Sequence, residues 1–401
     1  MKVSIIGQGY VGLTISAFAA AKHDVIGFDN SQRVVDQLNK GMSHIEGVES
    51  SVISRWAKEG RYLATTNGAD IKGSDIVVIA VPTPLTKDRK PDMSFIEAAC
   101  KTIAENIDRP VLVINESTSF PGTVRNFIKP LIEKLSENKF EHEYAISPER
   151  VDPGRGDYNQ KNTPRLYAGL TPEASEKTRE FYSSFCDQLV EVSSPEVAES
   201  AKLFENTFRQ VNIALVNEFA QIAHKLGISV HETLDAANTK PYGFMKFTPS
   251  AGVGGHCIPV DPTYLAHVAE QLGAPSTFIE RANEVNLEMP VYIVDRVEAD
   301  NGGSLKGKSV LVVGVAYKPN VADVRETPAE IVIEELRKRG AVVAWHDDVV
   351  GTWQGETSSP LSGAEITIVV TLHDVVKQSD VLASAPYVFD TTGKVKSAKT
   401  L

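Results

Sequence analysis

The sequence predicts an α/β protein with two doubly wound domains, joined by a long central helix and an all-helical middle region. The chain opens with a strand, a glycine-rich turn, a helix and a second strand. Residues 196–226 form one unbroken helical pattern, and strands alternate with helices again after residue 308. We therefore expect three domains, at residues 1–194, 195–300 and 301–401.

The composition argues against several classes of function. A chain of 401 residues is long for one hydrophobic core, and its 42% hydrophobic and 23% charged residues are typical of a soluble globular protein. The formal net charge of -11 argues against a nucleic-acid or membrane-surface binder. No apolar run approaches the roughly 20 residues that span a bilayer, and the first residues already read as a strand, so we expect neither a membrane segment nor a signal peptide.

The cysteines indicate the compartment. Cys100, Cys186 and Cys257 are odd in number and far apart in the chain. This usage suits a reducing cytoplasm, where we expect the protein, and argues against a disulfide framework. The sequence holds no CxxC pair and no HExxH pattern, so we expect no metal site.

The segment KVSIIGQGYVGLTISAFAAAKHDVIGFD carries the G-x-G-x-x-G fingerprint of a Rossmann-like dinucleotide site. Gly7 allows the tight turn, Gly9 lets a pyrophosphate approach the backbone, and Gly12 lets the helix pack on the strand. Asp29 ends the second strand, where an acid bonds a ribose hydroxyl. We expect NAD rather than NADP because this acid repels a 2′-phosphate, although Arg33 nearby leaves NADP open. The alternative is a glycine-rich turn of an unrelated α/β unit.

Three later strands of the first domain end in polar loops. Thr83 follows SDIVVIAV, Thr118 follows RPVLVIN, and Glu149 and Arg150 follow EYAISP. Each loop alone is what ordinary strand–helix connections use. Because ligands of open α/β sheets collect at the carboxyl ends of strands, three such loops in one domain favour a common crevice.

The long helical pattern has two distinct faces. Apolar residues recur every three or four positions and predict a core face. Lys202, Asn206 and Arg209 are spaced i, i+4 and i+7, so they share a second face. A solvated polar stripe is the alternative interpretation. A helix of roughly 30 residues with so much apolar surface is expected to lie buried between domains or subunits.

The segment GGHCIPVDP, residues 254–262, surrounds Cys257 with glycine and proline. Such a segment does not fit an ordinary helix interior or a regular strand, so we expect a loop that presents a thiol. The alternative is a small buried core residue. His256 is a neighbour that would lower the thiol pKa if it faced it, which the sequence leaves open.

The last domain repeats the strand-plus-glycine theme in KSVLVVGVAYK. Its turn lacks the second and third fingerprint glycines, so it should not bind a dinucleotide in the same way. Lys318 and Arg325 are expected on loops there, to meet a phosphate or to form surface ion pairs.

Together these motifs carry a family resemblance over nearly the whole chain. They are GQGYVGL, VPTP, ESTSFPGT, SPER, AKLFENTFRQVNIALVNE, GGHCIPVDP and AYKPNVADVRETPA. The chain resembles the UDP-glucose/GDP-mannose dehydrogenase family, the nucleotide-sugar 6-dehydrogenases. The resemblance implies an N-terminal NAD-binding domain, a central helical region for dimerisation and catalysis, and a C-terminal domain that binds the UDP-sugar.

The resemblance also implies a mechanism. Members of this family oxidise the C6 alcohol of a nucleotide sugar to a carboxylate with two NAD+ per turnover. Cys257 matches the family nucleophile, whose thiolate adds to the C6 aldehyde to give a thiohemiacetal and then, after a second oxidation, a thioester. Water then releases the acid.

Other roles follow from the same motifs. Lys202 matches the lysine that stabilises the C6 oxyanion, and Asn206 matches an asparagine that holds that oxyanion or a water. Asp261 is expected to accept a proton or orient the water, Thr118 to place water beside the nicotinamide, and Glu149 to act as base in thioester hydrolysis.

The binding residues implied by the resemblance form two sets. The cofactor set is Gly7, Gly9, Tyr10, Val11, Gly12, Asp29, Arg33, Thr83, Thr118 and Arg325. The substrate set is Glu149, Arg150, Lys202, Asn206, Arg209, Phe247, Gly254 and Lys318. Arg209 is the candidate for contact with the sugar or its acetamido group.

The motifs SPERVDPG, NTPR and KPYGFM resemble the UDP-N-acetylhexosamine branch of the family. We expect UDP-N-acetylglucosamine as substrate, with UDP-N-acetylmannosamine and UDP-glucose next. The UDP-glucose branch carries a second acid where this chain has Pro153. One departure concerns the cofactor: many members have an arginine where this chain has Thr392, which predicts weaker NAD binding unless Lys394 compensates.

Two other functions stay open. A two-electron β-hydroxyacid dehydrogenase shares the N-terminal fold and a long helical middle, but needs neither a loop cysteine nor a third domain. A non-catalytic NAD-binding sensor is the second, against which the set Cys257, Lys202, Asn206 and Asp261 argues. We expect a homodimer built on the long helix.

Overall fold

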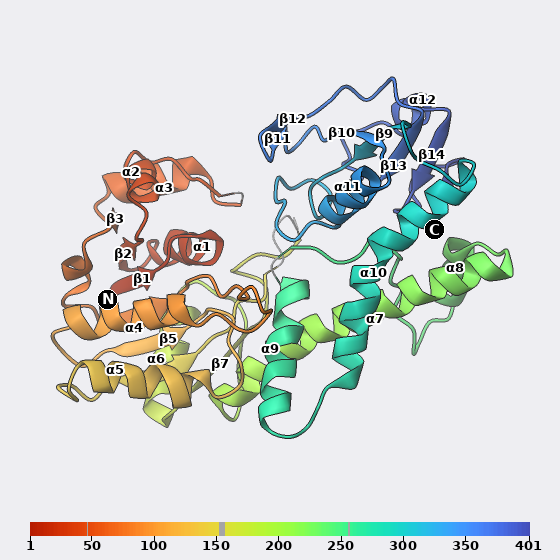
Figure 1. The fold of residues 1–401 in the computed structure, drawn as a ribbon. Coiled ribbons are helices and arrows are strands. Elements are labelled where there is room, and N and C mark those ends of the chain that lie inside the picture. Colours follow the sequence, from red (N-terminus) through yellow and green to blue (C-terminus); the bar gives the residue numbers. More distant parts are fainter. Residues whose placement is uncertain (46, 152–156, 256) are drawn as a thin grey trace. The chain divides into compact units, whose positions relative to one another are not determined.

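The computed structural model describes residues 1–45, 47–151, 157–255 and 257–401. The chain forms two compact units, Met1–Phe204 and Glu205–Leu401. The boundary between them lies within a long helix, α7, which carries the chain from one unit into the next (Figure 1). The three-domain division at residues 195 and 301 stays a prediction.

The first unit is built on one eight-stranded sheet in the order β3-β2-β1-β4-β5-β6-β7-β8. The strands are β1 (Lys2–Ile6), β2 (Asp24–Phe28), β3 (Tyr62–Thr65), β4 (Ile76–Ile79), β5 (Leu112–Asn115), β6 (Glu143–Ile146), β7 (Arg165–Gly169) and β8 (Leu189–Glu191). All neighbours pair in parallel except β6 and β7. From β1 the chain adds β2 and β3 on one side of the sheet and then β4 and β5 on the other. Ligands of doubly wound sheets bind at such a reversal of the strand order.

Helices cover both faces of this sheet. They are α1 (Tyr10–Ala19), α2 (Gln32–Asn39), α3 (Ser50–Lys58), α4 (Ser94–Asn106), α5 (Lys129–Leu135) and α6 (Pro172–Ser183), with short turns η1 (Gly68–Ile71) and η2 (Val124–Ile128). Successive strand residues face opposite sides. Ile76 and Val78 pack in the cluster with α1, α2, α3 and α6, whereas Val77 and Ile79 pack in the cluster with α4 and α5. Both faces of the strands are therefore apolar, as a buried parallel sheet requires.

The middle of the chain is helical, as predicted. The helices are α7 (Pro195–Leu226), α8 (Val230–Asn238), α9 (Cys257–Gln271) and α10 (Thr277–Asp300), and the described residues between Pro195 and Asp300 contain no strand. The single helix predicted over residues 196–226 is confirmed (Figure 1). It begins at Pro195, whose missing amide costs nothing in a first turn.

The second unit holds a five-stranded parallel sheet in the order β10-β9-β13-β14-β15. Its strands are β9 (Ser309–Val313), β10 (Val342–His346), β13 (Ile366–Val369), β14 (Tyr387–Asp390) and β15 (Lys399–Thr400), with a separate hairpin of β11 (Thr352–Trp353) and β12 (Glu356–Thr357). The helices α11 (Pro328–Lys338) and α12 (Gln378–Ala383) pack in different clusters, on opposite faces. The predicted fold class is thus confirmed.

Within the described ranges, no helix combines the length and apolar character needed to cross a bilayer.

Candidate active site

The fingerprint turn joins β1 to α1 in three residues. Gly7 has φ +92°, a conformation that favours glycine, and a Cβ there would lie 2.4 Å from the Ala80 carbonyl oxygen. A Cβ on Gly12 would lie 1.8 Å from the carbonyl oxygen of Gly7. Neither position therefore accepts a side chain without moving the backbone.

Gly9 is open on the side where its Cβ would project. No protein atom lies within 4 Å of that point, and no side chain caps α1, whose N-cap residue is Gly9. The first amides of a helix have no intrahelical acceptor and favour anionic groups. The turn therefore fits the pyrophosphate of a dinucleotide.

Asp29 lies immediately after β2 and binds the same turn. Its carboxylate accepts from the Gln8 amide at 2.9 Å and from the Ser31 amide at 2.8 Å, and its side chain stays half-buried. This places the acid beside the fingerprint, as the ribose role requires. Arg33 lies on α2 with its side chain exposed.

The other first-unit residues predicted for the cofactor lie at the start of α1 and after β4. Tyr10 and Val11 open α1 and are half-buried. Thr83 follows β4 and is buried.

Thr118 and Lys202 meet although they lie far apart in the sequence. Thr118 follows β5, Lys202 lies on α7, and the Lys202 Nζ donates to the Thr118 Oγ1 at 2.6 Å. Both side chains are buried, at 7% and 8% exposure. Within the first unit, the structure thus brings together a hydroxyl and an amine that the sequence assigned to one reaction.

Asn206 and Asp261 form a second pair, within the second unit. The Asn206 Nδ2 donates to the Asp261 Oδ2 at 2.6 Å, linking α7 to α9. Asp261 is fully buried. On α7, Asn206 follows Lys202 by four residues, which is one turn, so the predicted polar face of this helix is present. Arg209, on the next turn, is exposed.

Cys257 is exposed, as predicted, but its surroundings differ from the expected loop. The residues before it are irregular, and α9 begins at Cys257 itself. Pro259 is compatible with this helix because amides of a first turn need no intrahelical acceptor. The alternative of a buried core cysteine is wrong. The predicted influence of His256 lies outside the described residues, as does the Pro153 comparison.

Two glycines seat the Cys257 segment on the second α/β unit. A Cβ on Gly254 would lie 2.8 Å from the Glu326 carbonyl oxygen, and one on Gly255, which has φ +81°, would lie 2.7 Å from the Tyr317 ring. The Gly255 amide donates to the Arg325 carbonyl oxygen at 2.9 Å. The thiol is therefore held beside the loop of the AYKP motif.

The other predicted second-unit residues lie in or near this loop and on the segment after α8. Arg325 is exposed and pairs with Asp323, whose hydrogen bond raises the pKa of the guanidinium. The Lys318 Nζ lies 5.7 Å from the centre of the Tyr317 ring. Phe247 stacks edge-on against Phe208 of α7, with ring centres 5.9 Å apart.

Glu149 lies in a buried ionic network that the sequence did not reveal. Its carboxylate accepts from the Val151 amide at 2.6 Å, from the Arg165 guanidinium at 3.3 Å and from the Gln160 side chain. Arg165 also pairs with Glu116 at 3.0 Å and lies 4.5 Å from the centre of the Tyr182 ring. Arg150, the next predicted residue, donates to the Pro164 carbonyl oxygen at 2.8 Å.

The network contains two carboxylates and one guanidinium away from water. Burial raises the pKa of Glu116 to about 7, although Arg165 acts in the opposite direction. Burial would lower the pKa of Arg165, but Glu116 and Glu149 outweigh it and raise that pKa. The sequence signal for this network is the arginine that ends the motif NTPR, at the start of a buried strand.

Thr392, the departure from the family pattern, closes a turn after β14. Its amide and hydroxyl donate to the Asp390 Oδ1 at 2.8 and 2.7 Å. The nearby Lys394 is exposed. Among the described residues, no group of three or more His, Cys, Asp or Glu side chains is placed to hold a metal ion.

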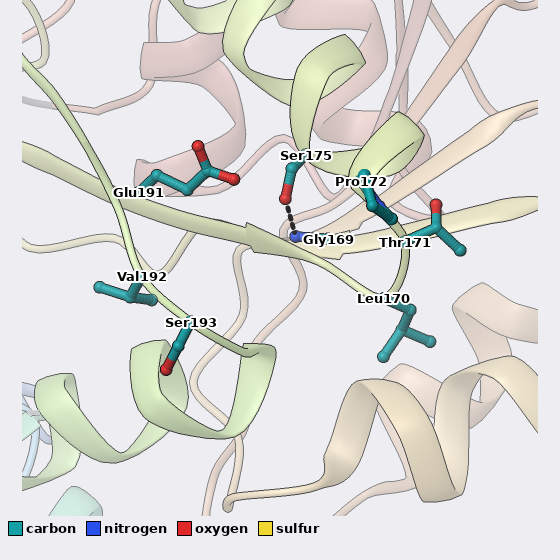
Figure 2. Close-up of a pocket in the computed structure, with 8 residues that line it drawn as sticks. All are labelled: Gly169, Leu170, Thr171, Pro172, Ser175, Glu191, Val192 and Ser193. Atoms are coloured by element: carbon teal, nitrogen blue, oxygen red, sulfur yellow. Dashed lines mark hydrogen bonds between the residues drawn. The ribbon is translucent and has the colours of Figure 1, made fainter.

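A hollow of about 550 Å³ lies on the first unit. Figure 2 shows the residues that line it. These residues are Gly169, Leu170, Thr171, Pro172, Ser175, Glu191, Val192 and Ser193. The Ser175 hydroxyl points to the strand and accepts from the Gly169 amide at 2.9 Å (Figure 2). None of the predicted site residues lines this hollow, so it is separate from the candidate site.

Family models match this chain in three consecutive parts. The NAD binding domain of the UDP-glucose/GDP-mannose dehydrogenase family matches residues 1–186, the central domain matches residues 196–288, and the UDP binding domain matches residues 311–397. The chain belongs to this family. The predicted resemblance is confirmed, and the cofactor is NAD.

The relatives of this chain within the family are named for different sugars. UDP-N-acetyl-D-mannosamine dehydrogenase of Pyrococcus horikoshii is 36% identical, over 94% of this chain and 90% of its own. UDP-N-acetyl-D-glucosamine 6-dehydrogenase of Pseudomonas aeruginosa is 33% identical, over 88% and 83%. The solved UDP-glucose dehydrogenase of Pyrobaculum islandicum has a TM-score of 0.88 at 26% identity, covering 100% of this chain and 96% of that one. As a member of this family, the chain is an NAD-dependent oxidoreductase.

The open side of Gly9 gives a direct test of the cofactor site. Gly9→Ala should weaken NAD binding by at least about tenfold, or about 1.4 kcal/mol, because the new methyl group would enter the space left for the pyrophosphate. Its unfolding midpoint in urea should match the wild type. Titration of the protein with NADH, followed by fluorescence, measures the affinity.

Gly12→Ala is the contrasting variant, and it should lose stability as well as binding, because its methyl group would overlap the Gly7 carbonyl oxygen. Unchanged NADH affinity in Gly9→Ala would show that the cofactor does not approach the backbone there.

Proposed function

We propose that the protein oxidises the C6 hydroxyl of a UDP-sugar to a carboxylate in two two-electron steps, with UDP-N-acetylglucosamine as the sugar. The observation that carries this proposal is the exposed Cys257 thiol at the start of α9, seated on the AYKP loop in a chain that contains the family's UDP binding domain. A two-electron alcohol dehydrogenase has no need of such a thiol.

The cofactor would be held by the fingerprint turn, by Asp29 at the ribose and by Thr83 and Thr118 in the strand-end loops. When bound, NAD supplies the hydride acceptor for each oxidation. Arg325 is the second-unit residue assigned to this set by the family pattern. Thr392 stands where the family pattern has an arginine, and its hydroxyl binds Asp390. We assign the role of that arginine to the exposed Lys394 of the same turn.

The chain's own groups would act on the sugar as follows. The Cys257 thiolate adds to the C6 aldehyde carbon, and the aldehyde oxygen takes the negative charge and then a proton. After the second oxidation, water attacks the thioester carbon and the Cys257 sulfur leaves as thiolate. Covalent attachment thereby keeps the aldehyde from leaving between the two oxidations.

Positive charge and fixed dipoles stabilise these steps. We assign Lys202 to the oxyanion at C6, since its buried ammonium already binds a hydroxyl oxygen, that of Thr118, at 2.6 Å. Asn206 and Asp261, linked at 2.6 Å, hold and deprotonate the attacking water. Glu149 is the second candidate base, with its carboxylate fixed by Arg165.

The residues proposed to contact the substrate fall into two groups. Glu149, Arg150 and Lys202 belong to the first unit. Asn206, Arg209, Phe247, Gly254 and Lys318 belong to the second unit. The exposed Arg209 guanidinium is suited to an acetamido carbonyl. UDP-N-acetyl-D-mannosamine is the second candidate, because a dehydrogenase of that name from Escherichia coli is 37% identical to this chain.

The compartment and the assembly complete the proposal. We place the protein in the cytoplasm, since its three cysteines are odd in number and far apart in the chain. We also infer a homodimer through α7. Exposed apolar residues recur along this helix at intervals of seven or four, namely Val197, Phe204, Phe208, Leu215, Ile222 and Leu226. Such a stripe needs an apolar partner.

The function is tested by counting NADH for each sugar consumed in a panel of UDP-sugars. We expect two NADH per sugar, with UDP-N-acetylglucosamine preferred, because oxidation of an alcohol to a carboxylate removes four electrons. Two NADH with UDP-N-acetylmannosamine or UDP-glucose would overturn the sugar and keep the mechanism. One NADH per sugar would favour the two-electron dehydrogenase, and none, with NADH still bound, would favour a sensor.

Replacement of the nucleophile tests the covalent step. Cys257→Ser should lower formation of the acid by about a hundredfold or more, because a serine hydroxyl is not ionised near neutral pH and an alkoxide is a poorer leaving group than a thiolate. Product analysis by mass spectrometry measures the acid. Cys100→Ala, at a buried position of α4, is the control and should keep two NADH per sugar. Full acid formation by Cys257→Ser would refute the thioester.

The dimer is tested with Leu215→Glu, which puts a charge at a side chain 61% exposed in the single chain. Sedimentation velocity should show a dimer for the wild type and a monomer for this variant, since a charge buried in an apolar interface lacks a partner. Val342→Glu, at an exposed position of an edge strand, should stay dimeric. A monomeric wild type at micromolar concentration would contradict the inference.

A further inference from the structure

A buried carboxylate on α7 holds the segment that follows β5. Glu199 is 2% exposed, and its side chain accepts from the Gly122 amide at 2.6 Å, from the Val124 amide at 3.1 Å and from the Ser119 hydroxyl at 3.5 Å. All three donors belong to residues 119–124, which come directly after Thr118.

The donors explain why a side chain with two acceptor oxygens is needed there. Gly122 and Val124 lie where the helical stretch of η2 and α5 begins, and such amides have no acceptor within the helix. Burial raises the pKa of Glu199 to about 8, although the two amides act in the opposite direction. None of the described ion pairs includes Glu199, so its partners are the dipoles of this segment.

The same face of α7 contacts this segment at a second point. Lys202 follows Glu199 by three residues, so both side chains project from one side of the helix. The Lys202 Nζ binds the Thr118 Oγ1 at 2.6 Å. The carboxylate and the ammonium therefore hold consecutive parts of one segment, residues 118–124.

We propose that Glu199 is a positioning residue for the reaction, which fixes residues 119–124 on α7 and so keeps the Thr118 hydroxyl within hydrogen-bond reach of the Lys202 ammonium. The inference rests on the proposed function, in which these two groups stand at the cofactor and at the C6 oxygen. Glu199 itself contacts neither substrate nor cofactor in this assignment.

Glu196 gives a matched control on the same helix. It lies one turn before Glu199 and pairs with Arg125 at 2.6 Å, so it links α7 to the same part of the first unit. Its side chain is 32% exposed, and surface ion pairs contribute little. Glu196→Gln therefore removes an acid of α7 that contacts the first unit but does not bind residues 119–124.

The test compares Glu199→Gln, Glu199→Asp and Glu196→Gln in the full chain. In Glu199→Gln, hydrogen exchange at Gly122 and Val124 should become about tenfold faster or more, because one side-chain oxygen is replaced by an NH2 donor. The kcat for NADH formation should fall by about 10- to 100-fold, with KM for the UDP-sugar and NAD within about threefold, as expected when catalytic groups shift by about 1 Å.

Glu199→Asp keeps the carboxyl group but shortens its reach, so its kcat and exchange rates should lie between those of Glu199→Gln and the wild type. It is the variant to measure if Glu199→Gln does not fold. Glu196→Gln should stay within about twofold of the wild-type kcat. Faster exchange with unchanged kcat in both Glu199 variants would overturn the positioning role. Glu199 would then only cap the helical stretch that follows Gly122.

The wild-type protein separates this inference from the proposed function. If it forms no NADH from any UDP-sugar, the proposed function fails, and exchange at Gly122 and Val124 decides whether Glu199 holds the segment. If it does turn over, the ratio of kcat between Glu199→Gln and wild type decides the inference. Equal kcat values and equal exchange would overturn it outright.

Discussion

Charged groups enclosed in the first unit constrain its structure most strongly, because each needs a partner where water cannot supply one. Arg165 at the start of β7 satisfies two carboxylates, Glu116 after β5 and Glu149 after β6. Since β7 is the strand that turns antiparallel, this one guanidinium joins three neighbouring strands at the point where the sheet changes direction. A shift of any of them would leave a buried charge unpaired, so the loops that carry Glu116 and Glu149 are fixed in position.

The helix α7 extends the same principle to the candidate site. On its first turns, Glu199 and Lys202 bind the segment after β5, and one turn later Asn206 binds Asp261 of α9. A helix keeps such spacings rigid over its length. Within each unit, one side chain of the pair is therefore held on a helix rather than on a loop.

In both α/β units an aspartate directly follows a strand, but the two aspartates have different contacts. Asp29 after β2 is half-buried and binds the fingerprint turn beside the open side of Gly9. In the second unit, Asp347 after β10 is 1% exposed, and its carboxylate accepts from backbone amides and from His373 at 3.0 Å. These contacts hold its pKa well below the usual range despite burial. An acid so occupied has no free oxygen for a ribose, in agreement with the incomplete glycine pattern of that turn.

The sequence by itself determined the local features: the fold class, the single helix of α7 and the fingerprint turn, because period, cap and glycine geometry act over a few residues. It also indicated an exposed Cys257, but not that a helix begins there. Only the tertiary structure decided the partners of buried charges. Glu199 and Gly122 lie 77 residues apart and Arg165 and Glu149 lie 16 apart, with no periodic signal to join them, so the pairing follows from how the elements pack.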